Sequence, residues 1–133
     1  MAFTFVIDGL SVPWAAHGGY GKRSFNPRYR EKQYTQWQLK AQFNRDAPIS
    51  GPVRVDLHFV RPIPKGTSKA RKLQMLNGII FPITRPDRGN YLKFYEDCLT
   101  GVAIEDDSQI VAGEVCKIFG ESPKTIIKLT ELA

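Results

Sequence analysis

The alternation of hydrophobic and polar residues along the chain predicts several separate strands. Residues 53–61 place Val, Val, Leu and Phe at every second position, with Arg, Asp and His between them, which is typical of a half-buried strand. Two stretches rich in aromatic and β-branched residues, 3–8 and 124–131, predict a first and a last strand. Residues 109–119 predict one more strand, with a bulge at Gly113. These patterns indicate a sheet of about four strands.

Residues 28–45 predict the first of two main helices. The stretch lacks Gly and Pro, and it is rich in Gln, Lys and Arg, which favour a helix. Tyr34, Trp37 and Ala41 recur at helical spacing. We therefore expect this aromatic stripe to face the core.

Residues 87–100 predict the second main helix. Asp87 follows a proline and is a natural N-cap residue. Asn90, Lys93 and Asp97 recur every three or four positions, so we expect them on one polar side, with apolar residues on the other.

The connection between the middle strand and the second main helix, residues 62–86, is unusually long. A short helix is expected within it at 68–76. The order of elements predicts an α+β fold in which two main helices pack on a mixed sheet. A length of 133 residues favours a single domain spanning 1–133.

The positive charge of the chain is concentrated in its middle. The formal net charge is +6, yet residues 22–93 hold 16 of the 19 Lys and Arg residues and only four of the 13 acidic ones. This asymmetry predicts a polyanion-binding face beside a cluster of carboxylates, although ordinary surface lysines would also give such a composition. The candidate DNA-binding residues are Lys22, Arg23, Arg28, Arg30, Arg61, Lys65, Lys69, Arg71, Lys72, Arg85 and Arg88.

Residues 15–27 are rich in Gly and basic residues, and they predict a mobile loop ending at Pro27. Lys22 and Arg23 lie near Tyr20 and Phe25, a mixture that suits contacts to phosphates and bases. An ordinary surface loop is an equally good explanation of this segment.

Several classes of protein are disfavoured by the sequence. No apolar run approaches the roughly 20 residues that a membrane span needs, and the start has no basic and apolar leader. Cys98 and Cys116 have no metal-ligand spacing and fit reduced, buried thiols. We therefore expect a cytoplasmic protein without a membrane partner or a small-molecule cofactor. No RNA-recognition motif is apparent.

Acidic residues that could bind a metal occur at the helix start and in a later turn. If the turn holding Asp106 and Asp107 folds back onto Asp87, three carboxylates converge and would be stabilised by Mg²⁺. Such an ion would polarise a phosphodiester, and Lys93 would stabilise the developing charge. Asn90 would orient a water or a phosphate. Alternatively, Asp87 is only a helix cap and the acidic pair only a turn.

The stretch from Arg85 to Ile110 carries a motif. It reads RPDRGNYLKFYEDCLTG, three further residues, then EDDSQI. It resembles the hallmark of RusA-type Holliday-junction resolvases, roughly (K/R)PD-x-DN-x2-K-x3-D-x-L-x-G, a short gap, then DD-x-Q(I/V). The positions in register are Arg85, Pro86, Asp87, Asn90, Lys93, Asp97, Leu99, Gly101, Asp106, Asp107, Gln109 and Ile110.

This resemblance implies a homodimeric, Mg²⁺-dependent endonuclease, with Mn²⁺ as a substitute, that binds four-way DNA junctions and nicks two strands symmetrically. It also implies a RusA-like mixed sheet flanked by helices, and members are often encoded by phages or prophages. Asp87 and Asp107 would be the metal-binding catalytic carboxylates and Lys93 the lysine of the site. Asn90, Asp97 and Asp106 would support them.

The chain departs from the family pattern at Gly89, where the family has its second aspartate. The site then has one carboxylate fewer. Asp106 or Asp97 could substitute, or the enzyme could be slow or prefer Mn²⁺. A third outcome is a protein that binds branched DNA without cutting it. The charge distribution supports that binding module as well as it supports a nuclease.

Overall fold

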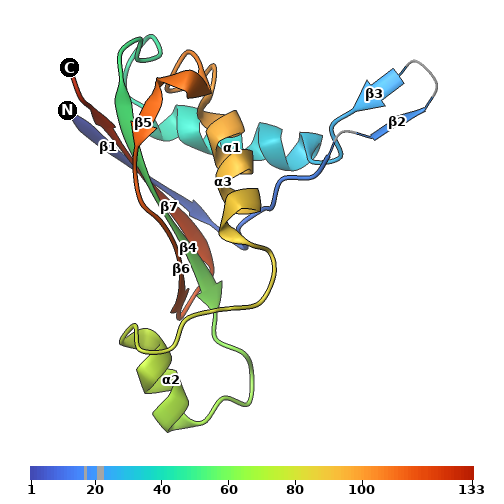
Figure 1. The fold of residues 1–133 in the computed structure, drawn as a ribbon, viewed down its shortest axis with the longest axis vertical. Helices are drawn as coiled ribbons and strands as arrows, with labels where there is room; N and C mark the ends of the chain where they lie inside the picture. The colour runs from blue at the N-terminus through green and yellow to red at the C-terminus, as the bar shows by residue number, and fades with distance from the viewer. Residues whose placement is uncertain (17, 21–22) are drawn as a thin grey trace.

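Across the described residues, a five-stranded mixed sheet forms the centre of the molecule (Figure 1). The computed structural model describes residues 1–16, 18–20 and 23–133. The strands of the sheet are β1 (Ala2–Asp8), β4 (Val53–Pro62), β5 (Ile110–Ala112), β6 (Val115–Gly120) and β7 (Lys124–Glu131). Strand β7 pairs antiparallel with both β1 and β4, whereas β4 pairs in parallel with β5 and β6. The predicted α+β fold with a mixed sheet is therefore confirmed, with one strand more than expected.

The two main helices, α1 (Tyr29–Gln42) and α3 (Arg88–Leu99), lie on the same side of this sheet (Figure 1). A third helix, α2 (Lys69–Leu76), lies apart from them beyond the end of β4. A 3₁₀ turn, η1 (Asp107–Gln109), leads into β5. No helix in the described ranges is long and apolar enough to cross a membrane.

The segment predicted as a mobile loop contains a small hairpin. Its strands are β2 (Gly18–Tyr20) and β3 (Arg23–Phe25), paired antiparallel. Lys22 lies outside the described residues, and the side chain of Arg23 is not described. The expected nucleic-acid contacts of these two residues therefore stay a prediction.

The core forms between one face of the sheet and the two main helices. The alternate residues of β4 that were predicted to be buried are confirmed: Val53, Val55, Leu57 and Phe59 are all at most 2% exposed. The ring of Phe59 stacks on Tyr91 of α3, with 4.7 Å between centroids, and lies 5.6 Å from Tyr95. Offset aromatic pairs of this kind add to the stability gained from burial. They seat α3 on the sheet.

The aromatic stripe of α1 faces solvent, so its predicted role in the core is wrong. Tyr34 and Trp37 are 52% and 69% exposed, and Ala41 is also exposed. The buried face carries Thr35 and Leu39 instead.

The side-chain amide of Gln42 fixes this rotation of α1. It accepts a hydrogen bond from the amide of Val6 and donates one to the carbonyl of Val6, both at 2.9 Å. The helix is thereby tied to the outer edge of β1. Because residues 35, 39 and 42 share one face of a helix, the aromatic side chains turn outward.

The single strand predicted at 109–119 is divided into β5 and β6. The division falls at Gly113, which has a φ of +150°. A Cβ atom there would overlap the backbone of Val55, so the chain approaches β4 more closely than any other residue would allow. The amide of Glu114 then donates to Asp56 Oδ1 at 2.9 Å, and pairing with β4 resumes at Val115.

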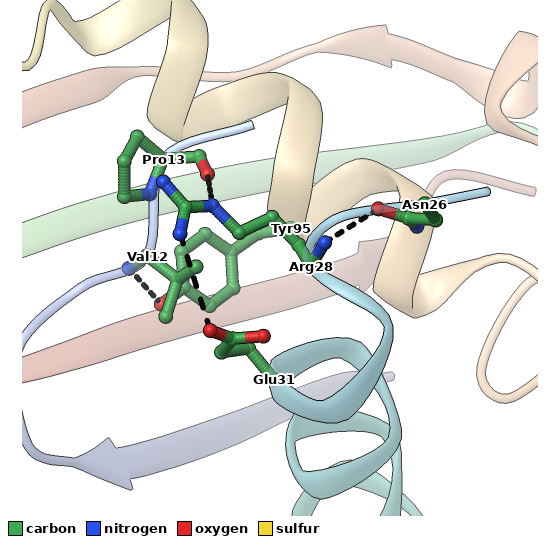
Figure 2. A network of polar contacts seen from close by, with 6 residues as sticks. All are labelled: Val12, Pro13, Asn26, Arg28, Glu31 and Tyr95. Atoms are coloured by element: carbon green, nitrogen blue, oxygen red, sulfur yellow. Dashed lines mark hydrogen bonds and ion pairs between the residues drawn. The ribbon is translucent and has the colours of Figure 1, made fainter. Parts of the chain in front are cut away.

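A buried hydroxyl network joins the segment after β1 to α3. The Tyr95 hydroxyl accepts hydrogen bonds from the amide of Val12 at 2.9 Å (Figure 2) and from the Thr125 hydroxyl at 3.2 Å. Nearby, the Arg28 Nε donates to the carbonyl of Pro13 at 3.2 Å (Figure 2). Residues 12 and 13 are therefore held between the two main helices.

We predict that Tyr95→Phe lowers the free energy of unfolding by about 1–3 kcal/mol, because the Val12 amide and the Thr125 hydroxyl lose a buried partner. Urea denaturation followed by circular dichroism measures the change. Tyr34→Phe, at an exposed position, is the matched control and should stay within about 0.5 kcal/mol of the parent. Equal stability of the two variants would contradict this account of the network.

Candidate active site

Asp87 forms the N-cap of α3, as predicted. Its backbone is extended, and its Oδ1 accepts a hydrogen bond from the amide of Asn90 at 2.8 Å. Both residues are exposed. An acidic cap is also favourable because the N-terminus of a helix carries partial positive charge. The cap therefore fixes the direction in which the carboxylate of Asp87 points.

Two cationic side chains from the sheet hold the segment that leads into Asp87. Lys117 of β6 donates from Nζ to the carbonyls of Thr84 and Pro86, at 2.7 and 2.9 Å. Arg61 of β4 donates from Nη1 to the carbonyl of Arg85 at 3.1 Å. Three successive carbonyls are thus bound by two strands, and the start of α3 is fixed relative to the sheet.

Lys117 was not among the predicted site residues. Burial and the charge of Arg61 hold its pKa below its ordinary value, while the charge of Asp87 opposes this. Strand alternation in the sequence could have placed it near the site, because Val115 and Lys117 lie on the same face of β6, the one that points toward the helices. Arg61, predicted to contact DNA, uses one guanidinium nitrogen for this structural role.

The turn holding the acidic pair is built by Asp106 and Gln109. Asp106 Oδ2 accepts a hydrogen bond from the amide of Ser108 at 3.0 Å. The side chain of Ser108 and this amide hold the pKa of Asp106 below its usual range. Gln109 accepts from the amides of Glu105 and Asp106, and its Nε2 donates to the carbonyls of two residues that precede β4. Asp107 is exposed between the two capping residues.

The acidic turn lies against α3 near Glu96, a residue that was not among the predicted site residues. Burial raises the pKa of Glu96, and the neighbouring charges of Asp107 and Asp97 raise it further. Glu96 is nine residues beyond Asp87, or about 13 Å along a helix. Among the described residues, no three His, Cys, Asp or Glu side chains lie close enough together to hold a metal. The expected convergence of Asp87, Asp106 and Asp107 is therefore not seen.

Lys93 lies on the same stripe of α3 as Gly89 and Glu96, since the three positions are spaced four and three residues apart. Its Nζ is 3.6 Å from the centroid of the Trp14 ring, a cation–π contact. The amide of Trp14 in turn donates to the carbonyl of Asn90 at 2.8 Å. Trp14 thus places the ammonium group beside the middle of the helix.

A groove runs beside this stripe, between α3 and the sheet edge. Its helix wall includes Arg88, Gly89, Leu92 and Glu96, and its other wall is the chain from Ile110 to Cys116. Arg88 reaches across, with Nη1 donating to the carbonyl of Val115 at 3.3 Å. A Cβ added at Gly89 would meet only Asp87 Oδ1, at an ordinary 3.5 Å. A side chain at position 89 would therefore fit.

The basic residues predicted to bind DNA fall into three places. Arg85 and Arg88 flank Asp87 and are exposed. Lys65, Lys69, Arg71 and Lys72 are exposed on and beside α2. Arg30 is exposed on α1, whereas Arg28 is partly buried and also faces Glu31 at 4.0 Å (Figure 2).

The candidate site is thus a surface of acidic and basic side chains on α3 and on the turn and strands beside it. The family model for endodeoxyribonuclease RusA matches residues 14–130. The chain is also 35% identical over 104 residues to the uncharacterized protein YqaN of Bacillus subtilis (strain 168), a match that covers 77% of this chain and 72% of that protein. The chain belongs to the RusA endodeoxyribonuclease family.

The family is one of endodeoxyribonucleases that bind branched DNA junctions and resolve Holliday junctions in recombination and repair, and membership places the chain in this class. Resolvases of this family depend on divalent metal ions in general. The resemblance drawn from the motif between Arg85 and Ile110 is therefore confirmed.

We predict that Glu96→Gln raises the thermal midpoint near pH 7. A raised pKa means that the folded state disfavours the carboxylate. The contribution of Glu96 to stability is therefore greatest below its ordinary pKa of 4.5. It is lost as the pH rises through the higher pKa that Glu96 has in the folded protein. The gain from the substitution should accordingly disappear near pH 4. Differential scanning calorimetry at both pH values tests this, with the exposed Asp46→Asn as control. An unchanged or lower midpoint at pH 7 would refute it.

Proposed function

We propose that this protein is a Mg²⁺-dependent endonuclease that binds four-way DNA junctions as a homodimer and resolves them by symmetric nicking, with Mn²⁺ as a substitute. The observation that carries the proposal is the packing of the acidic turn against α3, the helix that Asp87 caps, so that the charge of Asp107 acts on Glu96. Within a family of metal-dependent nucleases, a pair of carboxylates that repel each other beside a groove favours a catalytic role over a purely structural one.

The donors of the site fit a hard divalent cation. Mg²⁺ is usually held by one or two carboxylates, with waters and substrate phosphates completing its shell. Asp107 and Glu96 would supply such a pair, and a cation would relieve the repulsion by which the charge of Asp107 raises the pKa of Glu96. Asp106 is a weaker candidate, because its carboxylate caps the turn. The ion would supply polarisation of the phosphodiester and a lower pKa for the attacking water.

The remaining roles belong to other side chains of α3 and of the segment just before it. Arg85 and Arg88 flank Asp87 and would bind backbone phosphates at the N-terminal end of α3, away from the metal-binding pair. Lys93 would stabilise negative charge as the bond breaks, held in place by the Trp14 ring. Asn90 and Asp97 would orient a phosphate or a water. A four-way junction has two-fold symmetry, and a two-fold homodimer would present one such site to each nicked strand.

We expect Asp107→Asn to lower the rate of junction nicking by at least about 100-fold, equal to about 2.7 kcal/mol of barrier. The assay uses a labelled synthetic four-way junction with Mg²⁺, Mn²⁺ or EDTA, beside a linear duplex. Asp46→Asn, an exposed acid outside the site, is the matched control. Metal-dependent nicking that survives in Asp107→Asn would remove this residue from the proposed site.

Gly89→Asp should raise Mg²⁺-dependent cleavage, because it adds a carboxylate on the stripe that carries Lys93 and Glu96. The structure leaves room for the side chain, and glycine in a first helical turn is itself unfavourable by roughly 1 kcal/mol relative to alanine. Gly89→Asn separates the effect of charge from that of helix propensity. Cleavage by Gly89→Asp that is no faster than that of the parent would count against this role.

A second candidate function is binding of branched DNA without cleavage. It is favoured by Gly89 and by the separation of Asp87 from the Asp107 turn along α3. The same nicking assay distinguishes it, since a binding module would hold junctions tightly and cut them with neither metal ion.

A further inference from the structure

Residues 62–86, here named the α2 arm, form a basic projection at the end of the sheet. Figure 1 shows α2 standing away from α1 and α3. The arm has five Lys and Arg residues and no Asp or Glu. It is an ordered element, because Ser68 caps α2 through the amide of Arg71 and Met75 is buried, 6% exposed, beneath it.

The last part of the arm displays apolar side chains in an alternating pattern. Ile79, Phe81 and Ile83 are 66%, 52% and 93% exposed. The residues between them are less exposed: Pro82 is buried and Ile80 is partly buried. Three large exposed apolar side chains thus lie within five residues, here called the apolar face, and two of them, Phe81 and Ile83, line a shallow pocket at the end of the arm. Contiguous exposed apolar side chains often mark a site of interaction with another molecule.

Both ends of this segment are fixed to the rest of the molecule. At its start, the amides of Ile79 and Ile80 donate to the carbonyl of Gln74, which closes the end of α2. At its end, Lys117 and Arg61 bind the carbonyls of residues 84–86. Ile83 precedes Asp87 by four residues, so the two Cα atoms are at most about 14 Å apart. The apolar face therefore lies near Asp87, at the N-terminal end of the helix that carries the proposed metal-binding pair.

The charge of the arm indicates what covers this face. A second copy of the arm would bring five positive charges against five, which costs free energy. A polyanion with exposed apolar surfaces would instead match both the basic residues and the apolar ones. Nucleic-acid bases that are not fully stacked are such surfaces, and proteins insert Phe, Leu and Ile side chains between base steps in this way.

We propose that Phe81 and Ile83 form a wedge that packs against unstacked bases at the branch point of a DNA junction, while the basic residues of the arm hold the adjacent phosphates. The inference rests on the proposed function, since a branch point is what supplies such bases next to Asp87. The wedge gives the protein its preference for branched over linear DNA. The basic residues contribute affinity for both.

The test compares a double variant, Phe81→Ser with Ile83→Ser, with the parent protein in EDTA, so that binding is measured without cleavage. Four-way junctions carrying 2-aminopurine at the branch report unstacking by fluorescence, and a linear duplex of the same arms measures general affinity. We expect the double variant to bind the junction about tenfold more weakly, the value of stacking against one base. Its duplex binding, and the slope of log affinity against log salt, should stay unchanged.

Two control variants separate the wedge from other effects. Lys69→Gln with Lys72→Gln should weaken junction and duplex alike and reduce the salt slope by about 0.9 for each phosphate that is no longer neutralised. Leu10→Ser removes an exposed apolar side chain, 68% exposed, far from the arm in the sequence and should change neither substrate's affinity. Ile83→Ser alone, at a site that is 93% exposed, keeps the test available if the double variant unfolds.

Equal junction affinity and an unchanged 2-aminopurine signal in the wedge variants would overturn the proposal while leaving the proposed function intact. A change of mass in sedimentation, with unchanged junction preference, would assign the face to contact between copies and overturn it also. If the parent itself bound junction and duplex equally and nicked neither, the proposed function would fail and the wedge with it.

Discussion

The seating of α3 on the sheet is the constraint on which the site depends. Phe59 stacks on Tyr91, and Tyr95 buries its ring beneath the helix while its hydroxyl holds the segment that leads to Trp14. One face of the helix is thereby buried in the core, and the neighbouring face, which carries Leu92 and Glu96, lines a groove. Lys117 and Arg61 then fix the chain just before the helix begins. These contacts give Asp87 and the groove a set position relative to the basic arm.

Each charged side chain along this helix has a different neighbour. Asp87 lies near Lys117, Lys93 lies over an aromatic ring, and Glu96 faces the acidic turn, where burial and repulsion disfavour its charged form. A site that holds a disfavoured carboxylate is poised to gain stability from a cation or from a positively charged partner. The family's dependence on divalent metal agrees with that physical reading.

Local sequence patterns predicted the positions of helices and strands well. They predicted less well which face of a helix turns toward the core. The alternation in β4 correctly predicted its buried face, and the acidic residue Asp87 correctly predicted the start of α3, because each signal depends only on neighbouring residues. The exposed face of α1 was not predictable from its aromatic spacing, since the contact of Gln42 with β1 spans 36 residues. The same limit applies to the site. Asp87 and Asp107 could be predicted as site residues from the motif, but their surroundings could not. The approach of the acidic turn to Glu96 depends on Gln109, whose bonds reach carbonyls 58 and 60 residues away.

The central claim is that a divalent ion binds on α3 beside the acidic turn, and paramagnetic broadening of backbone amide signals by Mn²⁺ tests it most directly. Titration of the isotope-labelled protein should broaden amides around Glu96 and Asp107 first, and EDTA should restore them. In Asp107→Asn the same broadening should require more Mn²⁺. Broadening centred on another part of the chain, or none at these residues, would contradict the account.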